Sequence, residues 1–207
     1  MGVAFVGQGC RWSVGPVWNT ARMDLLAAVS EADADIAFNL GPLVLRVVVG
    51  IVFIAHGYNH IWGGGKIAGT AGWFESLGMR PGKLHAWTAS IVELAAGVML
   101  IVGLLTPLAG AAVIGVMTVA WITNHKSNGF FIFRPGEGYE YVMTLTFAGL
   151  ATALIPPGEW SLDHAFDLTD DLVGAPSLLI ALVAGFGGAI ALLALFWRPD
   201  PKADEPA

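Results

Sequence analysis

The chain of 207 residues has few charged side chains and a single cysteine. Charged residues make up 13% of it, apolar residues make up 56%, and the mean hydropathy is +0.68. This balance lies outside the range of ordinary soluble domains. Because Cys10 has no second cysteine to pair with, an internal disulfide, a CxxC redox pair, an iron–sulfur cluster and a thiolate zinc site are excluded. Any electron transfer must therefore use a bound quinone, a bound metal or a partner protein.

The sequence also lacks a basic patch and a ladder of aromatic residues, so nucleic acid is excluded as a partner. The net charge of −6 comes largely from the segment before Asn39 and from residues 159–171, which we interpret as charged flanks and loops. Glycine (27) and tryptophan (8) are abundant, as in helices that pack closely in lipid and carry aromatic anchors at the membrane surface. The sequence predicts an all-α integral membrane protein in contact with the lipid bilayer.

Hydropathy predicts a four-helix transmembrane bundle followed by a fifth, C-terminal transmembrane helix. Arg46 lies one turn inside the first span, and we expect its side chain to extend to the nearby membrane surface. The small residues of the fifth helix offer a surface for close contact with a partner or a second copy of the chain. The predicted spans are 41–62, 87–106, 107–123, 141–155 and 177–197.

These spans divide the chain into a tail (1–39), a four-helix domain (40–163), an acidic loop (164–176), the fifth helix (177–197) and a disordered tail (198–207). Residues 1–9 are apolar but lack a basic n-region and a sustained apolar core, so no cleaved signal peptide is predicted. Residues 23–37 are a candidate amphipathic helix at the membrane surface, and Met23 is an alternative start of the protein.

Lysine and arginine are distributed unevenly between the two sides that five spans define. One side receives Arg11 and Arg22. The other receives Lys66, Arg80, Lys83, Lys126, Arg134, Arg198 and Lys202. Because basic residues accumulate in cytoplasmic loops, we expect a multi-pass protein of the cell inner (plasma) membrane, with its N-terminus outside and its C-terminus in the cytoplasm.

Polar residues intrude on the apolar segments almost entirely at one end of the predicted bundle. His56 and Glu93 each lie about 9 Å inside neighbouring antiparallel helices, at ~1.5 Å per residue. Ionisable groups at such depth are costly and are kept mainly where they pair or work. We predict that the two residues touch and assign them as candidate catalytic residues. Shallower candidates for substrate binding are Asn59, His60, His125, Asn128, Glu140 and Tyr141, beside Asn124.

A histidine and a glutamate near lipid depth can exchange a proton with the carbonyl group of a quinone. Two alternatives remain open. The pair is either a structural hydrogen-bonded contact, or His56 and His60 hold a metal ion with Glu93 or Glu140 as a further ligand. Neither alternative makes a metal cofactor a firm expectation, and a bis-histidine haem is disfavoured by the depths of His56 and His125.

The connection between the first two spans is patterned as a short apolar helix. Trp73, Phe74, Leu77 and Met79 are spaced to share one surface. Such a segment lies on or dips into the membrane surface. It serves either as an anchor or as a lid over His56 and the residues near it.

Four stretches together resemble the DoxX family of small membrane proteins: "LRVVVGIVFIAHGYNHIW", "WFESLGMRPGKLHAW", "SIVELAAGVMLIVGLLTPLAG" and "NHKSNGFFIFRPGEGYEYVMTLTFAGLATALIPPGEWSLD". The similarity covers residues 40–163. It implies a four-helix membrane bundle and a link to redox biology, since the related DoxD proteins are membrane subunits of thiosulfate:quinone oxidoreductases. Some DoxX proteins are associated with oxidoreductase complexes that contain a sulfurtransferase and superoxide dismutase. The matching motif positions are His56, Glu93, Asn128, Glu140 and Tyr141.

The sequence and this resemblance lead to one main hypothesis and one alternative. The main hypothesis is an inner-membrane subunit of a quinone-linked oxidoreductase, acting in thiosulfate, sulfur or oxidative-stress chemistry. It would supply a quinone or proton site at the cytoplasmic membrane edge and receive electrons from a soluble redox protein. The alternative is a non-enzymatic membrane scaffold or a conduit for small solutes.

Overall fold

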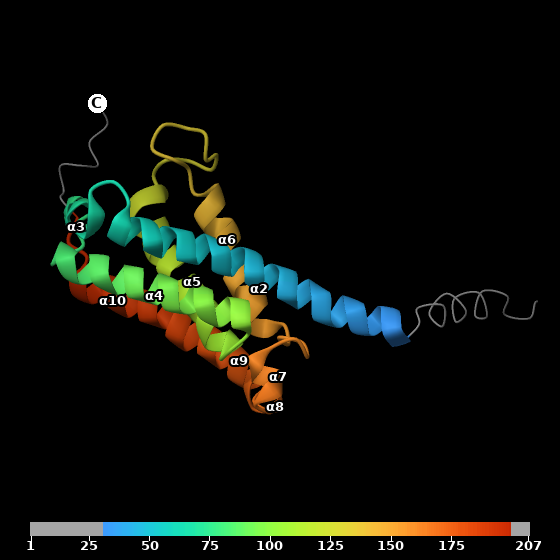
Figure 1. The fold of residues 1–207 in the computed structure, drawn as a ribbon. Helices are drawn as coiled ribbons and strands as arrows, with labels where there is room; N and C mark the ends of the chain where they lie inside the picture. The colour runs from blue at the N-terminus through green and yellow to red at the C-terminus, as the bar shows by residue number, and fades with distance from the viewer. Residues whose placement is uncertain (1–30, 200–207) are drawn as a thin grey trace, which may run out of the picture. The chain divides into compact units, whose positions relative to one another are not determined.

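The computed structural model describes residues 31–199, and the cysteine and most of the predicted N-terminal surface helix lie outside this range. The described residues are helical, without strands, and their long helices run side by side (Figure 1). In chain order the helices are α2 (Glu31–Trp62), α3 (Lys66–Ser76), α4 (Gly82–Val102), α5 (Thr106–Ala120), α6 (Glu140–Leu154), α7 (Leu162–Ala165), α8 (Thr169–Leu172), α9 (Ala175–Ile180) and α10 (Gly188–Phe196). Two π-helical segments, η1 (Trp121–His125) and η2 (Ala181–Gly187), continue α5 and connect α9 to α10.

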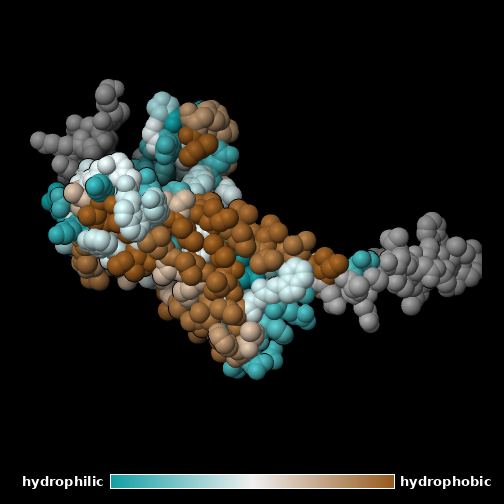
Figure 2. Space-filling model, in the orientation of Figure 1, coloured by the Kyte–Doolittle hydropathy of each residue, from teal (hydrophilic) through white to brown (hydrophobic). Residues whose placement is uncertain are grey.

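Four helical stretches within the described part of the chain are long and apolar enough to cross a membrane. They are Ile36–Trp62, Gly82–Val102, Thr106–His125 and Ala175–Phe196. Helix α6 is apolar but shorter, at 15 residues. Figure 2 shows hydrophobic residues over the middle of the helices and hydrophilic residues gathered towards their two ends.

The two ends of the helices are built differently. We call one the α3 end: there the residues that follow α10 pair with the segment between α3 and α4, because Arg198 N–H donates to the Gly78 carbonyl at 2.8 Å. The indole of Trp197 donates to the Leu77 carbonyl at 2.9 Å. We call the opposite end, where α4 turns into α5 and α7 follows α6, the α7 end.

Glycines bring two pairs of helices into close contact. A Cβ atom on Gly50 of α2 would lie 2.7 Å from the Gly97 carbonyl of α4, and a Cβ on Gly97 would lie 2.7 Å from the Gly50 carbonyl. Gly110 of α5 and Gly149 of α6 face each other in the same way. Small residues at helix crossings let backbones approach and strengthen packing where lipid gives no hydrophobic drive.

The C-terminal helix is packed within the chain. Gly185 of η2 lies against α5, where an added Cβ would be 3.0 Å from Ile114 and 3.2 Å from the Ala111 carbonyl. Ile114, Ala181 and Ala153 form a buried cluster between these helices. Part of the small-residue surface predicted for partner contact is therefore used inside the chain.

The side chain of Arg46 does not extend to the membrane surface, so that prediction is wrong. It is 1% exposed, and its guanidinium donates to the carbonyls of Leu100 (3.2 Å) and Trp160 (2.9 Å). Gly103 makes room for it, since an added Cβ would lie 2.1 Å from Arg46 Nη1. Gly103 also ends α4 at φ +68, where its N–H and that of the next residue bond back to the last turn, so glycine is required twice over.

Candidate functional site

A cavity of about 410 Å³ lies within the α3 end of the helices. Its volume falls in the range of small-molecule sites, about 300–1,000 Å³. Helices α5, η2 and α10 contribute small and apolar side chains to its wall. Helices α2, α4, η1 and α6 contribute its histidines, Glu93 and Tyr141. Both π-helical segments border the cavity, as π-bulges often do at functional sites.

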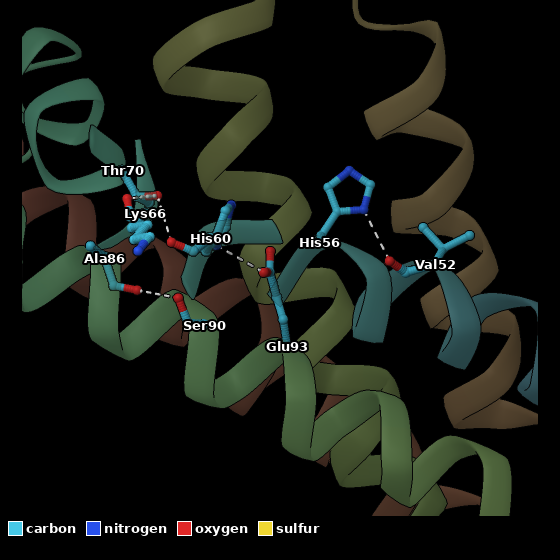
Figure 3. Close-up of polar contacts among 8 residues, drawn as sticks. All are labelled: Val52, His56, His60, Lys66, Thr70, Ala86, Ser90 and Glu93. Atoms are coloured by element: carbon cyan, nitrogen blue, oxygen red, sulfur yellow. Dashed lines mark hydrogen bonds and ion pairs between the residues drawn. The ribbon is translucent and has the colours of Figure 1, made fainter. Parts of the chain in front are cut away.

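Glu93 of α4 and His60 of α2 meet at this cavity (Figure 3). Glu93 Oε2 lies 3.1 Å from His60 Nδ1, with 4% of the glutamate and 16% of the histidine side chain exposed. The angles of this contact are not those of a hydrogen bond, and neither atom has another hydrogen-bond partner. A carboxylate held in this way is a buried acceptor with capacity left for a ligand.

The predicted contact between His56 and Glu93 is wrong, because the histidine that contacts Glu93 is His60. His56 Nδ1 donates to the Val52 carbonyl of its own helix at 3.0 Å, and its exposed ring stacks on Tyr141 of α6 at a centroid distance of 6.2 Å. Figure 3 shows the His56 ring directed away from Glu93, and the His60 ring towards it. Both histidines line the cavity, but the residue one helical turn further along makes the contact.

Two local features position His60. Gly57, one turn earlier, lets α2 approach α4, since an added Cβ would lie 2.9 Å from the Ser90 carbonyl and 3.2 Å from Glu93 Cβ. The Thr70 hydroxyl of α3 donates to the His60 carbonyl at 3.0 Å. Carbonyls in the last turn of a helix have no partner within the helix, so Thr70 closes the end of α2 and ties α3 to it.

His125 also lines the cavity, but its ring has partners on both sides. Nδ1 lies 2.7 Å from the Glu137 carbonyl, and Nε2 lies 3.1 Å from Asn124 Nδ2. These partners assign the neutral tautomer with the proton on Nδ1, because a carbonyl only accepts and an amide nitrogen only donates. His125 therefore fastens η1 to the loop before α6, and Asn124 contributes to the cavity wall beside it.

Three predicted binding residues lie outside the cavity wall. Asn128 holds the same loop, donating to the carbonyls of Asn124 (2.9 Å) and Gly136 (2.5 Å). Glu140 begins α6 and accepts from the backbone of the preceding loop. Asn59 is exposed on α2. Tyr141, in contrast, lines the cavity as well as stacking on His56.

The sequence analysis missed His85, which lines the cavity from the first turn of α4. Its side chain is buried, at 4% exposure, and its Nε2 has no hydrogen-bond partner. The spacing of His85, Ala89 and Glu93 carries the signal, because residues four apart form one ridge of a helix. All three line the cavity.

The predicted apolar helix between the first two spans is α3, and it forms part of the cavity wall. Trp73 and Phe74 line the cavity from this helix, and Met79 lines it from the segment that follows. Phe74 lies between two imidazoles, with ring centroids 6.4 Å from His60 and 6.2 Å from His85. The segment thus covers the polar residues and does not simply lie on the membrane surface.

In the described part of the chain, no three His, Cys, Asp or Glu side chains are grouped so as to hold a metal ion. His56 and His60, the HxxxH pattern of the sequence, are not part of such a group, because their rings contact different neighbours.

The helices and the cavity define a multi-pass membrane protein with a polar pocket at one end of its apolar helices. The DoxX family model matches residues 41–126. "Putative oxidoreductase CatD" of Bacillus subtilis (strain 168) is 30% identical over 115 residues, which cover 56% of this chain and 80% of that protein. The chain belongs to the DoxX family. No solved structure matches it.

Proposed function

We propose that this protein is the membrane subunit of an oxidoreductase and that its cavity binds a quinone from the membrane pool. The observation that carries the proposal is the buried Glu93 carboxylate on the wall of a largely apolar cavity. Its Oε2 lies 3.1 Å from His60 Nδ1 but has no hydrogen-bond partner. The name of the Bacillus relative, an oxidoreductase, supports the same class of activity.

The chemistry follows from the needs of the ligand. Reduction of a quinone to a quinol adds two electrons and two protons, and each carbonyl oxygen becomes a hydroxyl. His60 and Glu93 hold and pass a proton to one of these oxygens, as a positioned acid–base pair does. The electrons come from a soluble redox partner. Helix α3 shields the ligand from water.

We infer that α6 is a fifth crossing and that the α3 end faces the cytoplasm, with the protein in the inner membrane. The described Lys and Arg side chains support this orientation, because all except the buried Arg46 lie at the α3 end. In a Cys10→Ser background, Ser127→Cys should be shielded from an impermeant thiol reagent in intact cells. Asp170→Cys in α8 should react. The reverse labelling pattern would overturn the orientation.

The exposed apolar side of the last helix is the surface we propose for contact with a second copy of the chain within the membrane. Leu179, Val183 and Ile190 are more than half exposed there, whereas Gly185 faces α5. Blue-native electrophoresis tests this surface. Leu179→Asn combined with Ile190→Asn should reduce the size of the complex while the chain remains in the membrane.

The first test of function is purification from membranes with mass spectrometry of lipids and proteins together. Quinone and a redox protein should co-purify with the wild-type chain. Glu93→Gln should lower quinone-linked activity while abundance in the membrane stays near normal, because glutamine keeps the shape of the side chain. Recovery of the chain with neither quinone nor redox protein would favour the scaffold or solute-conduit alternative.

A double-mutant cycle separates function from folding at this contact. Glu93→Leu alone replaces the carboxylate 3.1 Å from His60 Nδ1 by an apolar side chain. A buried polar atom with no polar neighbour costs about 1–3 kcal/mol. His60→Leu together with Glu93→Leu should restore abundance, since replacing both partners by apolar groups can be nearly neutral. The activity should stay low in His60→Leu, in Glu93→Leu and in the double variant. If the activity of the double variant recovers with its abundance, these residues do not serve the reaction.

A further inference from the structure

His85 is a buried polar residue in aromatic surroundings. Its ring lies 5.1 Å from the Phe196 ring of α10 and 6.2 Å from the Phe74 ring of α3, as centroid distances. Nε2 has no hydrogen-bond partner, although the side chain is only 4% exposed. It differs in this from His125, whose two ring nitrogens both have neighbours within 3.1 Å.

An unpartnered buried nitrogen is costly to the fold. Leaving one without a hydrogen bond destabilises a protein by about 1–3 kcal/mol, and nearly all buried polar groups are paired for this reason. A leucine would fit the apolar environment of His85 without this cost. A ligand in the cavity would supply the missing partner, because His85 is part of the cavity wall.

The two sets of unpartnered atoms on α4 are separated along the helix. His85 and Glu93 are eight residues apart, or about 12 Å at the helical rise. Ala89 and Val92, between them, also line the cavity and are apolar. The cavity therefore presents polar groups at two separate places with an apolar wall between them. A ligand that satisfies both has polar atoms at opposite ends of an apolar body.

We propose that His85 is the second polar anchor of the ligand and that the ligand is a ring with oxygen atoms at opposite ends. One oxygen lies at the His60–Glu93 contact and the other accepts a hydrogen bond from His85. A para-quinone has this form, whereas a phenol with a single oxygen does not. The inference rests on the proposed function, and it adds a residue that selects rings with oxygen atoms at both ends.

Binding of two probes to the purified full-length protein in detergent tests the assignment. One probe is a short-chain para-benzoquinone, and the other is a phenol with the same ring substituents. Quenching of tryptophan fluorescence reports binding, since Trp73 lines the cavity. His85→Leu should weaken binding of the quinone about tenfold, the effect of losing one hydrogen bond, and leave binding of the phenol unchanged. His85→Gln, which keeps a donor, should recover most of the affinity.

Thermal unfolding without a probe distinguishes an anchor from a structural residue. His85→Leu should unfold at the same temperature as the wild type or a higher one, because it removes an unpartnered nitrogen. His164→Leu is the matched control, because this histidine is exposed in α7 and lies outside the cavity. The change should alter neither the affinity for the quinone nor the affinity for the phenol.

Three results would overturn the inference. Equal weakening of both probes in His85→Leu, together with a lower unfolding temperature, would make the residue structural. Unchanged quinone binding in that variant would remove His85 from the site while leaving the proposed function intact. Failure of the quinone to bind the wild-type protein would end both the inference and the proposed function.

Discussion

The two ends of the helices differ in how their buried ionisable side chains are bonded. At the α7 end, both oxygens of Asp163 accept backbone N–H groups, from Leu105 at 2.6 Å and Thr106 at 2.8 Å. Asn39 there accepts the Glu159 N–H at 2.7 Å, and two nitrogens of Arg46 donate to carbonyls. Only Arg46 Nε and the hydroxyls of Thr106 and Thr169 are buried without a partner among the described residues of this end. At the α3 end, buried atoms of His60, Glu93 and His85 have no hydrogen-bond partner.

The two ends also differ in the empty space beside these polar residues. The hollow beside Arg46 has no room for a water molecule, whereas the cavity at the α3 end has a volume of about 410 Å³. Polar groups that are closed by backbone partners fix how the chain turns between helices. Polar groups left open around a cavity are kept at a cost to stability, which is characteristic of binding sites. Neither burial nor a missing partner alone therefore separates a structural polar residue from a functional one, because Arg46 Nε is also unpartnered. The combination of an unpartnered atom with a cavity beside it does.

The largest expected effect is loss of stability from breaking the closed cluster. Asp163→Ala leaves the N–H groups at the start of α5 without partners and removes the cap of that helix. The expected loss is about 2–4 kcal/mol, visible as a marked fall in unfolding temperature and in membrane abundance. Asp170→Ala, an exposed acidic residue in the neighbouring α8, is the control and should change neither. An equally stable Asp163→Ala protein would show that the closed cluster does not fix the fold.

A smaller effect should follow from separating α2 and α4 beside the open site. Gly57→Ala places a Cβ within 2.9 Å of the Ser90 carbonyl, and overpacking of this kind costs about 1–3 kcal/mol. We expect a lower unfolding temperature and weaker quinone binding, because His60 moves away from Glu93. Gly41→Ala in the same helix has nothing within 4 Å of the added Cβ and should be neutral. If Gly57→Ala binds quinone normally, this crossing does not set the geometry of the site.

Among the single substitutions, the smallest expected effect concerns the tie between α3 and the end of α2. Thr70→Val keeps the shape of the side chain but removes the hydroxyl that donates to the His60 carbonyl. The loss should be about 0.5–1.5 kcal/mol, with faster hydrogen exchange across residues 66–76. Thr144→Val serves as the control, since that hydroxyl bonds only within α6. Equal exchange of α3 in both variants would show that the hydroxyl does not hold α3 in place.

Removing the C-terminal helix also tests which parts of the chain form the open site. The sequence predicts a four-helix domain over residues 40–163, so a chain ending at Thr169 would keep that core. In the structure Gly188 and Leu192 line the cavity, and Ile114 packs against Ala181. We therefore expect the truncated chain to lose quinone binding and to unfold at a lower temperature. Normal quinone binding by the truncated chain would show that the C-terminal helix is not part of the site.

The apolar helices were predictable from the sequence because hydropathy alone determines which segments can lie in lipid. One boundary was wrong at α4, which was predicted from residue 87 and is observed from Gly82. Lys83 and His85 lower the hydropathy of this turn, but the helix starts earlier because Glu75 accepts the Gly82 N–H at 3.3 Å. This contact comes from α3, so hydropathy along α4 did not contain it.

The candidate site was predictable only in part. Residue depth along each helix identified the correct end, and five of the eight predicted residues line the cavity: His56, His60, Glu93, His125 and Tyr141. The position of a residue in the sequence gives its height along the helix axis, but it does not give the rotation of the helix about that axis. That is why His56 was chosen as the partner of Glu93, where the structure has His60 one turn further along. The crossing of α2 and α4 at Gly57 determines that rotation.

The sequence by itself determined the class of protein, the apolar helices and the end at which polar residues gather, because these depend on composition and on distance along the chain. Only the tertiary structure decided which polar groups find partners. Arg46 and Asp163 bond to backbone from segments distant in the sequence, while Glu93 and His85 face a cavity that α5 and α10 complete. A hydrogen bond requires that two groups lie close together in space. The apolar pattern of a helix does not set this distance, because the positions of its polar side chains depend on how the helix crosses its neighbours.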